Sequence, residues 1–111
     1  MTNIELQNIA ESNFSLETNN WNDGKLFVQS KSFYGPRGEC YHYALFEEGK
    51  LYALGNEQGN YAGGIYAYAN QERAGYSNKE YPFLTISQYH IDELPTDLKE
   101  FVSQVIKEAK Q

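Results

Sequence analysis

The chain has 111 residues, the size of one domain, and its moderate charge content of 22% and only three prolines argue against disorder. Fifteen acidic residues against nine basic ones give a net charge of −6, which argues against binding to nucleic acid or to an anionic membrane surface, because both require clustered cations. The composition is rich in aromatic residues, with ten Tyr, six Phe and one Trp. Tyrosine suits half-buried sheet faces and binding surfaces alike.

Cys40 is the only cysteine, so the chain forms no intramolecular disulfide. Residues 1–5 lack the basic region and apolar run of a signal peptide, and no apolar stretch approaches the ~18 residues of a membrane span. We therefore expect a soluble, cytoplasmic protein whose residues 1–111 form a single domain.

A short helix is predicted over residues 3–12. Thr2 and Glu5 have the spacing of a capping box, with the hydroxyl first and the carboxylate three residues later. Leu6, Ile9 and Ala10 then share one helical face.

Three strand-like segments follow the helix, joined by short turns. Residues 14–21 and 25–34 flank the turn 22–24, and the connection 35–38 leads into a β-hairpin over 39–56. Parallel pairing needs a long crossover, so these strands are predicted to form an antiparallel meander.

The hairpin has two possible registers at its polar turn. A two-residue turn at Glu48-Gly49 pairs Phe46 with Leu51, whereas a type I turn with a glycine bulge pairs Phe46 with Lys50. The one-residue difference moves Leu51 and Ala53 to the opposite face, and the sequence leaves both registers open.

Residues 55–78 are predicted to be a loop, with 65–69 as a possible short strand inside it. The segment contains five Gly, four Tyr and four Asn. This mixture of rigid aromatic and adaptable polar residues resembles the composition of antibody paratopes. We therefore expect it to carry a binding function.

The chain is predicted to end with a strand over 81–90 and a helix that opens within 92–96. The helix has one continuous apolar stripe, formed by Leu98, Phe101, Val102, Val105, Ile106 and Ala109. The predicted fold is therefore α+β: an antiparallel sheet of about five or six strands, a C-terminal helix on one face and a short N-terminal helix.

The sequence gives only weak support to a catalytic site or a metal site. Cys40 and His42 leave the same face of a strand, but residues two apart are about 7 Å apart, too far for a direct thiol–imidazole hydrogen bond unless the side chains lean together. A metal site built from Cys40, His42 and His90 lacks the paired short spacings typical of zinc. A metal-free ribonuclease site built from Arg37, Glu39, His42 and His90 conflicts with the acidic balance. We expect neither a metal nor a cofactor.

The candidate partner-binding residues are Tyr61, Tyr66, Tyr68, Asn70 and Tyr76. Tyr66 and Tyr68 are two apart, so on a strand they should share one face. An alternative interpretation is that these tyrosines only complete the second face of the sheet.

The function predicted from these features is that of a non-enzymatic protein that inhibits or sequesters a protein partner. The acidic balance favours a basic partner, and immunity proteins or phage-encoded inhibitors are analogies in size and charge. The alternatives are a module that binds a small polar ligand such as a carbohydrate, and a small enzyme that uses Cys40 and His42. An uncovered sheet face also allows a homodimer.

Overall fold

The computed structural model describes residues 1–21, 23–36, 38–58, 61–69 and 84–109, and for residues 61–63 and 84 it describes the backbone. The elements are α1 (Asn3–Phe14), β1 (Glu17–Asn20), β2 (Lys25–Gln29), β3 (Phe33–Gly35), β4 (Gly38–Glu47), β5 (Lys50–Gln58), β6 (Tyr61–Tyr68), β7 (Leu84–Thr85), α2 (Gln88–Asp92) and α3 (Thr96–Ala109).

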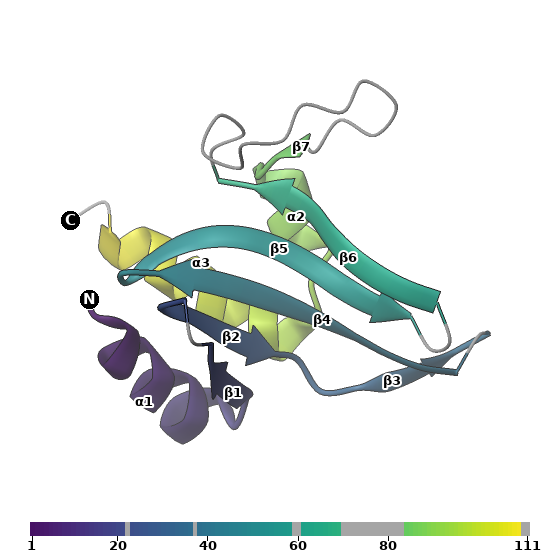
Figure 1. Ribbon diagram of the computed structural model, residues 1–111, viewed down its shortest axis with the longest axis horizontal. Helices are drawn as coiled ribbons and strands as arrows, with labels where there is room; N and C mark the ends of the chain where they lie inside the picture. The colour runs from purple at the N-terminus through teal and green to yellow at the C-terminus, as the bar shows by residue number, and fades with distance from the viewer. Residues whose placement is uncertain (22, 37, 59–60, 70–83, 110–111) are drawn as a thin grey trace.

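One sheet contains all the described strands, in the order β1-β2-β4-β5-β6-β7 (Figure 1). Strand β3 is outside this order and pairs with β4, at the other end of β4 from the part that pairs with β2. Every pairing is antiparallel except that of β6 with β7, which is parallel. The predicted α+β fold, with an antiparallel sheet, an N-terminal helix and a C-terminal helix, is confirmed. None of the described helices is long and apolar enough to cross a membrane.

Helix α1 begins at the predicted capping box. Thr2 Oγ1 accepts a hydrogen bond from the Glu5 backbone N–H at 3.2 Å, and the Glu5 carboxylate accepts from the Thr2 N–H at 3.4 Å. The helix runs two residues beyond the prediction, to Phe14, and ends where Ser15 adopts the left-handed conformation. The first strand therefore begins at Glu17 rather than at Phe14.

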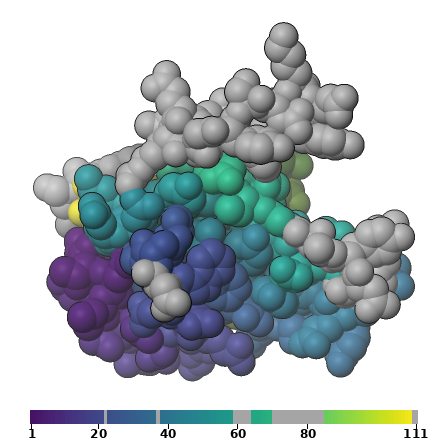
Figure 2. Space-filling model, in the orientation of Figure 1, coloured from purple at the N-terminus to yellow at the C-terminus, as the bar shows by residue number. Residues whose placement is uncertain are grey.

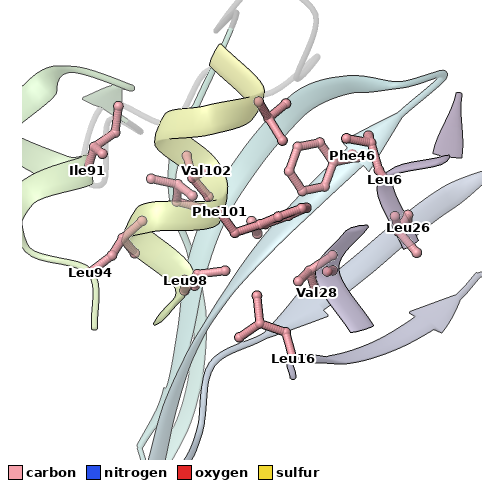
Figure 3. Packing of buried hydrophobic residues seen from close by; sticks show 14 residues of the cluster. Leu6, Leu16, Leu26, Val28, Phe46, Ile91, Leu94, Leu98, Phe101 and Val102 are labelled. Carbon is pink, nitrogen blue, oxygen red and sulfur yellow. The ribbon is translucent and has the colours of Figure 1, made fainter. Parts of the chain in front are cut away.

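The main core lies between the three helices and one face of the sheet, which we call the helix side (Figure 3). Phe101 of α3 lies at its centre, with ring centroids 5.6 Å from Phe46 of β4 and 5.7 Å from Phe14 of α1. Leu6 of α1 and Ile91 of α2 belong to the same cluster. Elements from both ends of the chain thus bury the same side of the sheet.

The strand predicted over 81–90 is wrong over its second half. Residues 81–83 lie outside the described part, β7 is only Leu84–Thr85, and Gln88–Asp92 is helical. The His90 imidazole accepts a hydrogen bond from the Ser87 N–H at 3.1 Å, and Ile91 N–H donates to the Ser87 carbonyl at 3.3 Å. These local bonds close a helical turn, which alternation of apolar residues does not reveal.

The loop predicted over 55–78 is wrong at 55–58 and 61–64, whereas the possible strand inside it over 65–69 is part of β6 as far as Tyr68. Strand β5 continues to Gln58, and β6 spans Tyr61–Tyr68. Gly55 pairs with Tyr43, whose ring covers it so closely that a Cβ on Gly55 would overlap the ring. This glycine therefore serves close packing within a sheet rather than a loop.

The β4–β5 hairpin adopts the two-residue turn, with Glu47 opposite Lys50 and Phe46 opposite Leu51. Glu48 and Gly49 both have positive φ, 50° and 78°, as a type I′ turn requires. The register then shifts, so that Leu45 lies opposite Ala53. Because of this bulge, Leu51 packs on the helix side and Ala53 on the other face.

Candidate functional site

The second face of the sheet carries a cluster made only of strand residues, which we call the aromatic face. Leu45 and Ala53 are buried at its centre. Aromatic and aliphatic side chains surround them: Phe27, Tyr41, Tyr43, Tyr52, Ile65 and Tyr68. Among the described residues no helix contributes to this cluster, and strand residues, coloured blue to green, form the middle of the surface facing the reader in Figure 2.

The rings on and beside the aromatic face form two groups of contacts, which together involve four strands and one turn. Phe27 of β2 lies 4.9 Å from Tyr43 of β4, between ring centroids, and stacks at 5.8 Å on Trp21, which follows β1 and is 43% exposed. On the other side, Tyr52 of β5 meets Tyr68 of β6 edge to face at 5.6 Å. Such contacts hold the rings in fixed positions before any partner arrives, which lowers the entropy cost of binding.

Carboxylates give this face a negative potential around Tyr41, toward the end of the β4–β5 hairpin that is remote from its turn. Burial raises the pKa of Tyr41, and the nearby Glu57 and Glu39 raise it further. Burial, with Glu57 second, raises the pKa of Tyr43 to about 12. Both hydroxyls therefore stay protonated at neutral pH and remain able to donate hydrogen bonds.

A paired lysine lies at the opposite side of the face. Lys25 Nζ lies 5.1 Å from the centroid of the Tyr52 ring, 2.6 Å from the Asp23 carboxylate and 3.9 Å from that of Glu47. Its charge is balanced locally, so it does not cancel the potential of Glu39 and Glu57.

The structure separates the predicted tyrosines. Tyr68 lies on the aromatic face, whereas Tyr66 packs on the helix side. The prediction that they share a face is wrong, because the β5–β6 register shifts between Leu54 and Gly55 and places one extra residue in β6. Tyr61 belongs to β6, with its side chain outside the described part, and Asn70 and Tyr76 lie outside the described residues.

Tyr66 lies between the two histidines. Its ring centroid is 6.5 Å from that of His42, edge to face, and 6.0 Å from that of His90. Burial, with Glu93 second, raises the pKa of Tyr66 to about 12. Burial lowers the pKa of His42, against a smaller opposite effect of Glu93. Tyr66 is thus half-buried on the helix side, where it packs against the main core.

The groups proposed for catalysis are engaged elsewhere. The Cys40 thiol donates to the Gly38 carbonyl at 3.4 Å, and the His42 ring stacks on Phe33 with centroids 6.2 Å apart. Glu39 and His42 project from opposite faces of β4, which separates two members of the ribonuclease hypothesis, and Arg37 lies outside the described residues. Within the described ranges, no three His, Cys, Asp or Glu gather as a metal site would require.

No protein-family model, curated protein or solved structure matches this chain. The candidate site is therefore argued from its geometry and chemistry.

Sequence reasoning missed most of the aromatic face. Phe27, Tyr41, Tyr43 and Tyr52 belong to it, and Trp21 stacks on Phe27 beside it, but none of these was among the predicted binding residues. Alternation along each strand could have identified these residues as one face of the sheet. Phe27 lies between the core residues of its strand, and Tyr41 and Tyr43 alternate with Ala44 and Phe46. Their assembly depends on β4 lying between β2 and β5.

Proposed function

We propose that this protein is a non-enzymatic, cytoplasmic protein that inhibits or sequesters a basic protein partner through the aromatic face. The observation that carries the proposal is the cluster of Tyr and Phe side chains on the aromatic face, with Trp21 stacked on Phe27 beside it, on which no described helix packs. Tyrosine and tryptophan in such positions supply much of the binding energy of protein interfaces.

The charge of the face supports a basic partner. Glu39 and Glu57 lie close enough to Tyr41 to raise its pKa, and the whole chain carries a net charge of −6. A cationic segment of the partner would meet carboxylates beside the half-buried ring of Tyr41, and arginine pairs with carboxylates and stacks on aromatic rings. The free cysteine accords with a reducing compartment. Immunity proteins and phage-encoded inhibitors are the classes of protein that this combination suggests.

A capture experiment with matched variants tests the proposal. Wild type, the double variant Tyr52→Ala/Tyr68→Ala and the control Tyr89→Ala would serve as baits in a lysate of the source cells. Tyr89 is 69% exposed and belongs to α2, away from the aromatic face. We expect a stoichiometric basic protein to be retained by wild type and the control and lost by the double variant, with thermal melts showing that all three baits are folded.

The purified pair then tests the role of charge. Glu39→Gln/Glu57→Gln should slow association at low salt and leave dissociation nearly unchanged, whereas Glu100→Gln, on an exposed position of α3, should change neither rate. Retention of the same protein by the double tyrosine variant would refute the proposal. Sedimentation of wild type alone as a dimer, and of that variant as a monomer, would replace the proposed partner with a second copy of this chain.

A further inference from the structure

A cavity of about 310 Å³ lies at the end of the β4–β5 hairpin that is remote from its turn. The described side chains that line it come from three strands and one turn: Phe33, Pro36, Cys40, His42, Asn56 and Gln58. Its volume is at the lower end of the range found for small-molecule sites.

Strand pairing places these side chains on the helix side of the sheet. Cys40 lies opposite Phe33 on β3 and opposite Gln58 on β5, and His42 lies opposite Asn56. Directly paired residues of antiparallel strands project to the same face, and His42 contacts Tyr66 of the main core. The cavity is therefore distinct from the aromatic face.

The described lining side chains on this face carry no charge. Glu57 and Tyr41 also border the cavity, but alternation along their strands directs their side chains to the aromatic face. Burial lowers the pKa of His42, which keeps the imidazole neutral at pH 7. A phosphate or carboxylate group would find no cation among these side chains.

Two carboxamides that line the cavity are available to a ligand, those of the half-buried Asn56 and the exposed Gln58. The carboxamides of Asn56 and Gln58 make no side-chain hydrogen bond to a described residue.

We propose that this cavity binds a small, neutral, planar heterocycle with hydrogen-bond donors and acceptors on its edge, the chemistry of a nucleobase. Phe33 and His42, whose ring planes differ by 21°, offer flat surfaces for stacking. A carboxamide presents a donor and an acceptor side by side, which matches the edge of such a ring. This site goes beyond the proposed function and does not depend on it.

The single thiol of the chain makes binding measurable in the wild-type protein. Cys40 is 8% exposed and lines the cavity, so an occupied cavity should protect it from N-ethylmaleimide. The probes are adenine, cytosine and uracil, with glucose as a non-planar control, and mass spectrometry follows alkylation. We expect at least one base to slow alkylation saturably, by about tenfold at ten times its Kd, because only the free protein reacts. Equal protection by glucose, or no protection by any base, would overturn the proposal.

Variants then test the recognition chemistry. Gln58→Leu and Asn56→Leu remove the carboxamides, and Gln104→Leu removes one that donates to Glu108 at 3.2 Å on α3. Protection by the base should be lost in the first two and kept in the third. If Asn56→Leu fails to fold, the exposed Gln58 carries the test. Unchanged protection in Gln58→Leu would show that the base is not held through this amide and would overturn the assignment.

Discussion

The contact between Gly55 and the Tyr43 ring makes Gly55→Ala a sensitive test of the aromatic face. A Cβ built on Gly55 would overlap the Tyr43 ring, with Cε2 at 2.6 Å among its three nearest atoms. Carbon atoms pack at about 3.5–4.0 Å, so the ring would have to retreat by roughly 1 Å. Tyr43 is only 7% exposed and packs on Phe27, so this movement disturbs a closely packed pair.

We expect Gly55→Ala to lower the free energy of unfolding by about 1–3 kcal/mol, the usual cost of overpacking, reduced by the smaller backbone entropy of alanine in the unfolded chain. For a domain of this size that corresponds to a fall in Tm of roughly 4–12 °C. Urea denaturation and thermal melts followed by circular dichroism measure both quantities. Gly64→Ala is the matched control, because nothing lies within 4 Å of a Cβ at that position.

A double-mutant cycle isolates the cause. Tyr43→Val removes the ring atoms that the new methyl group would meet, so Gly55→Ala in that background should be neutral or stabilising by up to about 1 kcal/mol. An equal loss in both backgrounds, or no loss in the wild type, would refute the packing of Tyr43 on Gly55.

Three further changes test the helix side and α1. Burial lowers the pKa of His42, so between about pH 6.5 and the folded-state pKa only the unfolded chain takes up the proton, and wild-type stability should fall as the pH drops through this range. His42→Gln removes this group and should make stability less dependent on pH there. Tyr66→Phe should lessen the loss of stability as pH rises from about 10 toward the folded-state pKa of about 12, leaving the part due to Tyr43. Thr2→Ala should destabilise the protein by about 1 kcal/mol through loss of the α1 cap, measured by urea denaturation at neutral pH.

Each of these has a clear contrary result. An unchanged acid limb in His42→Gln would assign that pH dependence to other groups. A Tyr66→Phe curve that superimposes on the wild type above pH 10 would show that the Tyr66 hydroxyl titrates normally in the folded protein. If Thr2→Ala melts like the wild type, α1 is held by its packing on α3 and the sheet alone.

Local chemistry explains what the sequence predicted well. The α3 stripe around Phe101 has one periodicity and faces one core, and the Thr2–Glu5 box acts within a single turn. These features need no knowledge of distant partners. The hairpin itself was also predicted, although its register at Glu48-Gly49 was left open and is decided only by the structure.

The bulges explain what the sequence could not predict. Strict alternation predicts that Tyr66 and Tyr68 share one face of the sheet, and that Leu51 and Ala53 do so as well. One extra residue in each strand places the two members of each pair on opposite faces. The extra residue is set by the neighbouring strand and by packing across the sheet. Tyr68 was predicted as a binding residue from the sequence. The rings on neighbouring strands that surround it could be assigned to the same face only once the strand order was known.

The placement of all three helices on one side of the sheet has a consequence during synthesis of the chain. Phe46 and Leu6 reach their final burial only when Phe101 is present, and α3 is the last described element to be made. Until then a growing chain exposes the apolar residues of both sheet faces. Such intermediates are prone to aggregate and are natural substrates for chaperones. A ribosome-bound chain that stops before Thr96 should therefore be protease-sensitive, and the inclusion of α3 should confer resistance in one step.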